Sequence, residues 1–331
     1  MKELKFSDGH ISHVDDRTAQ LINELVNKKR IADDSVKLLS SVTSPLIKTM
    51  ISEKVGREII FDSMPKNELV VAKTSEGINY VVNTSDRVIG RSVYVNKQSH
   101  DAHHLTKALS LIPGRKTLLL DVGANIGTIG ILGIFKGYFE KCIAFEPEPN
   151  NFKLLRLNVL LNGLDEKFEL RNEALSNEKT SSLDFELSET NYGDHRVRLQ
   201  KAPGLHKEDN RKVISVNVNT LDLALDGYEN DECVLFMDTQ GFEGHVLNGA
   251  KNLIKKSIPI VSEFWPYGLN RSNGIELFYD VLSNSDYTAM WDLKNPGVKM
   301  KFSIDEMRKI AFNLGEKGNF TDLLFINEKK E

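Results

Sequence analysis

The sequence predicts an α/β fold with a mostly parallel sheet covered by helices on both faces. Short apolar runs alternate with helix-spaced segments from residue 117 onward. A glycine-rich turn, residues 121–127 with the sequence DVGANIG, follows the first apolar run and opens a helical segment. Four of the apolar runs also end in an acidic residue. Because parallel strands buried on both faces are continuously apolar, this pattern favours a doubly covered sheet.

Residues 1–110 are expected to form an N-terminal helical and β-hairpin extension that precedes the main domain, residues 111–331. Helix-spaced apolar residues occur in three early segments, 19–27, 35–39 and 44–54. β-branched residues on both sides of Gly77 predict a hairpin, with 68–73 paired to 79–83. A helical cap on the core is favoured over a self-association device, and a homo-oligomer remains the alternative.

The expected elements of the main domain alternate in type. The strands are expected at 117–122, 141–145, 168–170, 233–237, 258–262, 287–291 and 322–327. The helices are expected at 105–111, 128–137, 150–161, 244–254 and 275–282. Two extra strands, 183–187 and 213–217, flank a polar loop at 189–198, which is the candidate lid or acceptor-binding segment.

Composition limits the function classes. The chain has 331 residues, of which 40% are hydrophobic and 27% charged, as in soluble globular proteins. A net charge of −4 gives no reason to expect nucleic acid or an anionic membrane as partner. The two cysteines, Cys142 and Cys233, lie in apolar runs and are expected to be buried thiols in a reducing compartment. No apolar run approaches the ~18–20 residues of a membrane helix, and no secretory signal is seen, so a cytoplasmic protein is expected.

The glycine turn is the candidate ligand site. In an open parallel sheet the ligand lies beyond the carboxyl ends of the strands. The acidic residues that end the apolar runs, Asp121, Glu146, Asp238 and Glu263, would line one rim there. A nicotinamide dinucleotide would need G-x-G-x-x-G, but Asn125 occupies the middle position and Gly127 follows by two residues. S-adenosylmethionine fits better, since it has a ribose for Glu146 but no phosphate.

Three motifs together resemble the FkbM family of S-adenosylmethionine-dependent methyltransferases. They are DVGANIG at 121–127, AFEP at 144–147 and FMDTQGFE at 236–243, and NEALS at 172–176 also matches. The resemblance covers about residues 80–265, with Thr239 departing from the family's usual small aliphatic residue. It implies the class I methyltransferase fold, a Rossmann-like, mostly parallel seven-stranded sheet. It also implies O-methylation of a sugar or other small metabolite.

The resemblance assigns cofactor contacts residue by residue. Gly123, Ala124 and Asn125 would bracket the methionine moiety, and Glu146 would hold the ribose. Glu173 and Ala174 would flank the adenine. The full expected cofactor set is Asp121, Gly123, Ala124, Asn125, Gly127, Glu146, Pro147, Glu173, Ala174 and Asp238.

Four residues are candidates for the chemistry, because methyl transfer needs alignment and a base helps a poor hydroxyl nucleophile. Asp238 is preferred as a cofactor or acceptor contact over a solvated strand-end acid. Glu243 is either functional or a helix N-terminal acid. His195, beside Asp194, is a general base or a solvated loop histidine, with equal weight. Glu263 precedes the aromatic run 264–267, which either floors a sugar site or, more commonly, packs in the core.

The other polar clusters are interpreted as surface residues rather than as metal or anion sites. No metal is assigned, although Asp238 and Glu263 offer oxygen ligands for a hard divalent ion as a less favoured alternative. The histidines of the segment 100–104 are interpreted as surface residues at a helix start, and Arg196 and Arg198 as surface charge rather than an acceptor anion site. The expected partner is a small-molecule acceptor. The rival functions are a nicotinamide-dependent oxidoreductase and a non-catalytic scaffold.

Overall fold

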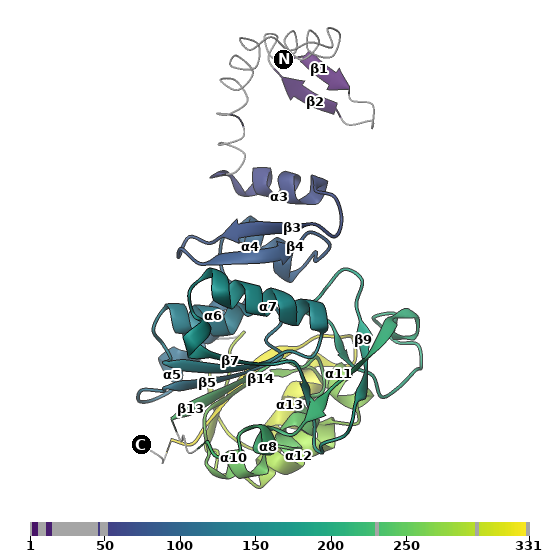
Figure 1. The fold of residues 1–331 in the computed structure, drawn as a ribbon. Coiled ribbons are helices and arrows are strands. Elements are labelled where there is room, and N and C mark those ends of the chain that lie inside the picture. The colour runs from purple at the N-terminus through teal and green to yellow at the C-terminus, as the bar shows by residue number, and fades with distance from the viewer. Residues whose placement is uncertain are drawn as a thin grey trace. The chain divides into compact units, whose positions relative to one another are not determined.

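The computed structural model describes residues 2–5, 11–14, 46, 52–228, 232–294 and 298–328 (Figure 1). Its contacts divide the chain into two units, Met1–Met64 and Pro65–Glu331. In the first unit, β1 (Lys2–Lys5) and β2 (Ile11–Val14) form an antiparallel pair, and α3 (Lys54–Ser63) follows. The strand pair was not expected. The helices expected at 19–27 and 35–39, and most of 44–54, lie outside the described residues.

An eight-stranded sheet forms the centre of the second unit, in the order β16-β15-β17-β14-β13-β5-β6-β7. Five neighbouring strands, from β14 to β7, are parallel, and β17, β15 and β16 join through antiparallel pairings. The bounds are β5 Leu118–Val122, β6 Lys141–Phe145, β7 Phe168–Arg171, β13 Cys233–Met237, β14 Ile260–Phe264, β15 Ala289–Asp292, β16 Lys299–Lys301 and β17 Thr321–Ile326. This confirms the predicted Rossmann-like fold, with the short edge strand β16 added to the seven strands expected.

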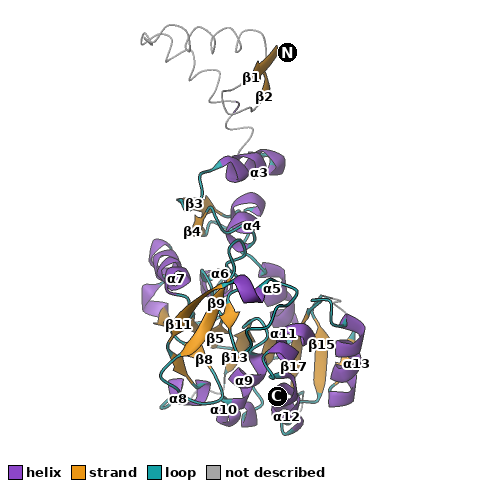
Figure 2. Ribbon diagram, turned by 90° about the vertical axis from the view of Figure 1, so that its right-hand side faces the viewer, coloured by secondary structure: helices purple, strands orange, loops and turns teal. Residues whose placement is uncertain are grey.

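Helices cover both faces of this sheet, as predicted. α6 (Thr128–Phe135) and α7 (Pro149–Leu161) lie on one face, and α8 (Leu221–Ala224), α10 (Lys251–Lys255) and α12 (Ile275–Ser283) on the other (Figure 1). α7 and α13 (Ile304–Leu314) lie at opposite ends of this unit with strands between them (Figure 2). Strands β5, β13 and β14 are buried throughout, which explains their continuous apolar sequences. Both cysteines are buried and free, as expected.

The predicted β-hairpin belongs to the second unit. β3 (Leu69–Lys73) pairs with β4 (Asn79–Asn83), and α4 (Ile89–Asn96) and α5 (Ala102–Leu111) follow. Asn158 of α7 and Asn162, which caps that helix, bind the hairpin backbone: the N–H of Val81 donates to Asn158 Oδ1 at 2.6 Å, and the N–H of Asn79 donates to Asn162 Oδ1 at 2.9 Å. These bonds join the hairpin to α7 within the second unit.

One predicted helix is interrupted. Residues 244–254 form two helices, α9 (Glu243–Asn248) and α10, because the backbone at Gly249 passes against the 174–177 segment. A Cβ on Gly249 would lie 2.0 Å from the carbonyl oxygen of Ser176. The two extra strands are confirmed as β9 (Leu183–Leu187) and β11 (Lys212–Val216), which form a small antiparallel sheet with β10 (Arg196–Val197).

Shorter elements complete the chain. β8 (Ala174–Leu175) pairs in parallel with β12 (Val218–Asn219), and α11 (Pro266–Arg271) follows β14. Within the described ranges, no helix has both the length and the apolar character that a membrane span requires.

Candidate active site

The glycine turn after β5 brings two strand ends into contact. Gly123 has φ +86°, and a Cβ there would lie 1.9 Å from the carbonyl oxygen of Asp238 at the end of β13. Asn125 (φ 52°) and Gly127 (φ +90°) continue the left-handed backbone into α6. Asparagine tolerates this region better than most residues, and glycine occupies it without strain. The turn therefore needs this residue pattern to expose its backbone beside Asp238.

Glu146, at the end of β6, is bound to the glycine turn. Its Oε2 accepts from the N–H of Asn125 and its Oε1 from the N–H of Glu148, both at 2.8 Å. The side-chain amide of Asn172 donates to the Glu146 carbonyl oxygen at 2.8 Å. Burial raises the pKa of Glu146 to about 8, partly offset by the two backbone donors. The carboxyl group is therefore fixed in position before any ligand binds.

A pocket of about 610 Å³ opens between the turn, Glu146 and the small β9–β11 sheet. Most of the expected cofactor residues line it, as does His195: the lining includes Gly123, Asn125, Glu146, Pro147, Glu173, Ala174, His195 and Asp238. Three acidic residues, Glu146, Glu173 and Asp238, belong to this lining.

Three of the expected cofactor residues lie behind the pocket wall instead. Asp121 is 2% exposed, and its Oδ2 accepts from the N–H of Gly130 at 3.0 Å, which ties β5 to α6. Ala124 is buried, and Gly127 packs close to Leu155 of α7. These residues shape the turn without lining the pocket.

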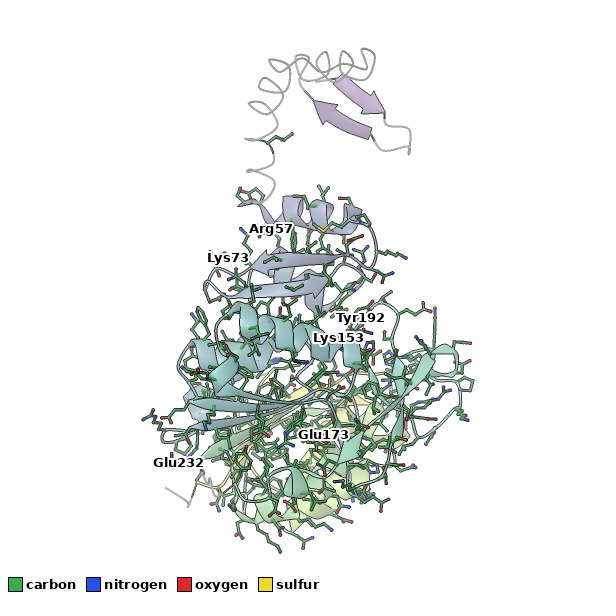
Figure 3. All side chains as sticks on the ribbon, viewed as in Figure 1. Arg57, Lys73, Lys153, Glu173, Tyr192 and Glu232 are labelled. Atoms are coloured by element: carbon green, nitrogen blue, oxygen red, sulfur yellow. The ribbon has the colours of Figure 1, made fainter. Side chains whose placement is uncertain are left out.

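The sequence did not single out several residues of the wall. Ile89 of α4, Phe185 of β9 and Phe242 line the pocket together with Tyr192 from the predicted lid. Tyr192 lies beside α7 (Figure 3), and its carbonyl oxygen accepts from the side-chain amides of Asn125 at 2.8 Å and Asn151 at 3.1 Å. The segment predicted as a lid is thus hydrogen-bonded to the glycine turn.

His195 is half-buried in the wall, and its hydrogen bond fixes which ring nitrogen carries the proton. Its Nδ1 accepts from the N–H of Ser188 at 3.0 Å, and burial lowers its pKa to about 4. The neutral ring therefore carries its proton on Nε2. This geometry favours a hydrogen-bond donor rather than the general base considered from the sequence, and it differs from a solvated loop histidine.

A second, larger cleft of about 1540 Å³ adjoins the first pocket. The two share Asp238, Ile89 and Gly193, so Asp238 lies at their junction. Several acidic and aromatic side chains line the cleft, including Asp101, Asp194, Glu263, Trp265, Phe320 and Asp322. Burial raises the pKa of Asp238 to about 6.

Glu243 lines neither cavity but holds the loop that follows Asp238. Its Oε1 accepts from the N–H of Thr239 at 2.8 Å, the Thr239 hydroxyl at 3.0 Å and the N–H of Gly241 at 3.2 Å. Thr239, which departs from the family's usual aliphatic residue, thereby contributes two of these donors.

Three sequence interpretations need correction or refinement. His104 is buried rather than a surface residue, with Nδ1 3.6 Å from Asp322 and 3.7 Å from Asp101. Arg196 is also buried, paired with Glu186 at 2.9 Å and Glu208 at 3.1 Å, because the packed β9–β10 pair encloses it. The aromatic run divides between two roles, since Phe264 is fully buried in the core and Trp265 lines the cleft.

Asp121→Asn is expected to flatten the pH dependence of stability. Burial raises the pKa of Asp121 to about 7, so the folded state keeps a proton that the unfolded chain releases above about pH 4. The stability of the wild type therefore falls as pH rises from about 4 to 7, by up to a few kcal/mol from this group. Asparagine keeps the acceptor for Gly130 without that cost. Urea unfolding of the cofactor-free wild type and variant at pH 5 and pH 8 tests this. The same change in the free energy of unfolding between the two pH values in both proteins would contradict it.

The chain is similar to several solved structures, including methyltransferases. Methyltransferase FkbM from Methylobacillus flagellatus KT is 16% identical over 93% of this chain and 59% of that chain, with a TM-score of 0.39. P. horikoshii TYW2 in complex with MeSAdo is 13% identical over 94% of this chain and 100% of that one, with a TM-score of 0.39. M. jannaschii tRNA m1G37 methyltransferase is 12% identical over 80% of this chain and 58% of that chain, with a TM-score of 0.40.

The family assignment rests on sequence rather than on these distant structures. This chain spans 59% of the first of them. A search among curated proteins finds no match. The family model described as the methyltransferase FkbM domain matches residues 121–312, which include the glycine turn, Glu146, Asp238 and Glu263. The chain therefore belongs to the FkbM methyltransferase family, whose cofactor is S-adenosyl-L-methionine.

Proposed function

We propose that this protein transfers the methyl group of S-adenosylmethionine to a hydroxyl oxygen of a sugar or another small metabolite. The observation that carries the proposal is the place of Asp238, which lines both the 610 Å³ pocket and the larger cleft. The cofactor occupies the pocket, with its ribose at Glu146. The acceptor occupies the cleft, so the methyl group and the hydroxyl meet beside Asp238.

The reaction is an in-line displacement at carbon. A lone pair of the acceptor oxygen attacks the methyl carbon as the carbon–sulfur bond breaks, and the bonding pair leaves with sulfur. The acceptor proton passes to the Asp238 carboxylate, and the products are a methyl ether and S-adenosylhomocysteine. With its pKa raised to about 6, Asp238 is ionised at neutral pH and is a stronger base than an ordinary aspartate. Alignment of the acceptor oxygen, the methyl carbon and the sulfur provides the rest of the rate enhancement.

The lining of the cleft supports a small polyhydroxy acceptor. Carboxylates accept hydrogen bonds from hydroxyl groups, and Asp101, Asp238 and Glu263 line the cleft. We further propose that the reaction takes place in the cytoplasm, which agrees with two buried free thiols.

Methyl-labelled S-adenosylmethionine incubated with a panel of sugars and small hydroxylated metabolites tests the proposal. Mass spectrometry and NMR of the product should show the label on oxygen. Asp238→Asn is expected to lower kcat by roughly 10²–10⁴-fold, the range for a lost general base. Its affinity for S-adenosylhomocysteine should change much less. Labelled nitrogen, or full activity in the variant, would contradict this assignment.

Two rival functions give different results in the same assays. A nicotinamide-dependent oxidoreductase would bind reduced nicotinamide cofactor in a fluorescence titration, and Asn125 in the glycine turn argues against that. A non-catalytic scaffold would bind S-adenosylmethionine tightly but methylate no acceptor.

A further inference from the structure

Three carboxyl groups converge beside the junction of the two cavities. Asp238 follows β13, Glu243 begins α9 and Glu263 lies in β14, and one oxygen atom from each lies within 4.8 Å of the other two. Glu243 is 0% exposed and Glu263 4% exposed. The end of β13, the start of α9 and the end of β14 therefore bring acidic groups together away from water, an arrangement that is costly unless the charge is balanced.

The hydrogen bonds within the cluster are donated by neutral groups. The Gln240 amide donates from Nε2 to Asp238 Oδ1 at 2.7 Å and to both Glu263 oxygens at 3.3 Å. Glu243 Oε1 accepts from the 239–241 segment, as described above, whereas Glu243 Oε2 is buried without a hydrogen-bond partner. A fully buried carboxyl oxygen without a donor, beside two other carboxyl groups, is suited to bind a cation.

We propose that Asp238, Glu243 and Glu263 bind one divalent cation that prefers oxygen ligands, such as Mg²⁺ or Mn²⁺. Two ligands of one hard cation lie at most about 4–5 Å apart, since each metal–oxygen bond is about 2.0–2.6 Å long. The three oxygens meet this limit. A half-turn of the Gln240 amide would replace its Nε2 by Oε1 and add a fourth oxygen ligand. The donor set contains no sulfur or imidazole, which disfavours zinc.

The position of the cluster gives the cation a use. Asp238 lines both cavities and Glu263 lines the acceptor cleft. One oxygen of Asp238 would bind the ion and the other would accept the proton of the acceptor hydroxyl, whose pKa the nearby ion would lower. This catalytic role of the ion rests on the proposed methyl transfer. Binding of the ion does not rest on it, because all the ligands of the ion come from this chain.

A second group, Asp101, His103 and His104, also has ligand atoms within 4.8 Å of one another, and it serves as the matched control. His103 is exposed, and Asp101 is half-buried and pairs with His100 and His104. The Asp101 carboxylate has the ring nitrogens of His100 and His104 at 3.4 and 3.7 Å, whereas Glu243 Oε2 has no hydrogen-bond partner. Asp101→Asn should therefore change cation binding much less than Glu263→Gln does.

Calorimetric titration of MgCl2 and of MnCl2 into the full chain without cofactor tests the proposal, with Mn²⁺ counted by electron paramagnetic resonance. One ion per chain is expected. Glu263→Gln should weaken binding by at least about tenfold while the protein stays folded, since the amide fills the same volume. If Glu263→Gln does not fold, Gln240→Met provides the second test. This variant should bind the cation more weakly than the wild type but still bind it.

The outcomes separate this proposal from methyl transfer. The proposal would be overturned if the wild type bound no ion at millimolar concentration. It would also be overturned if Glu263→Gln bound the ion with wild-type affinity, or if only Asp101→Asn lost binding. S-adenosylhomocysteine is titrated separately into the metal-free protein. Failure of that titration would count against the proposed function and leave the cation result standing.

Discussion

Replacing Glu146 by alanine is expected to weaken the binding of S-adenosylhomocysteine by about 10²–10³-fold. At pH 9, above the raised pKa of about 8, the Glu146 carboxylate can accept one hydrogen bond from each ribose hydroxyl, and a hydrogen bond to a charged group contributes about 1.5–3 kcal/mol. The change also removes the acceptor for the N–H of Asn125, which fixes the glycine turn in the free protein. Both losses act on the cofactor side of the site, so titration calorimetry with the demethylated cofactor measures them directly.

Two matched variants separate ribose recognition from general damage. Glu166 is exposed and far from the pocket lining, so Glu166→Ala should bind as the wild type does. Glu146→Gln keeps the size of the side chain but presents an amide, so its affinity should fall between those of the wild type and Glu146→Ala. Unchanged affinity in Glu146→Ala would mean that the cofactor ribose lies elsewhere.

The strands and the rim of the site could be predicted because their signals are local. β5, β6, β13 and β14 are buried on both faces, so each appears as an uninterrupted apolar run. In a parallel sheet their carboxyl ends share one edge, which is why Glu146 and Asp238 were expected together. The pocket lining confirms that they meet.

Features that depend on distant contacts could not be predicted in this way. The break at Gly249 results from the backbone of Ser176, some 70 residues earlier in the chain, and an amphipathic pattern carries no sign of it. Ile89 lies in a segment with no motif, although it lines both cavities. The tautomer of His195 depends on the N–H of Ser188, which the spacing of the polar loop does not reveal.

The same limit applies to the acidic residues. The sequence alone does not distinguish the roles of Glu243 and Glu263. Glu243 lies shortly after one apolar run, and Glu263 ends another. The structure separates them: Glu243 binds the loop after Asp238 through Oε1, and Glu263 faces the acceptor cleft. Their convergence with Asp238 depends on the order of β13 and β14 in the sheet, which no local pattern specifies.

Gly123→Ala is expected to destabilise the fold by at least about 3 kcal/mol. A Cβ would lie 1.9 Å from the carbonyl oxygen of Asp238 and 2.9 Å from its carbonyl carbon. These are backbone atoms at the end of a buried strand, so no side-chain rotation can relieve the overlap. The ends of β5 and β13 must separate, which would also displace Asp238 from the pocket and abolish cofactor binding.

Gly137→Ala distinguishes this steric overlap from backbone strain. Gly137 also has positive φ, +70°, but a Cβ there would meet nothing within 4 Å. Alanine at that position therefore costs only the left-handed backbone, about 1–2 kcal/mol, and leaves the site intact. Urea unfolding and calorimetry of both variants isolate the contact between the strand ends. Equal destabilisation of the two would show that the turn tolerates a side chain at Gly123, and that the approach of the glycine turn to Asp238 does not depend on glycine.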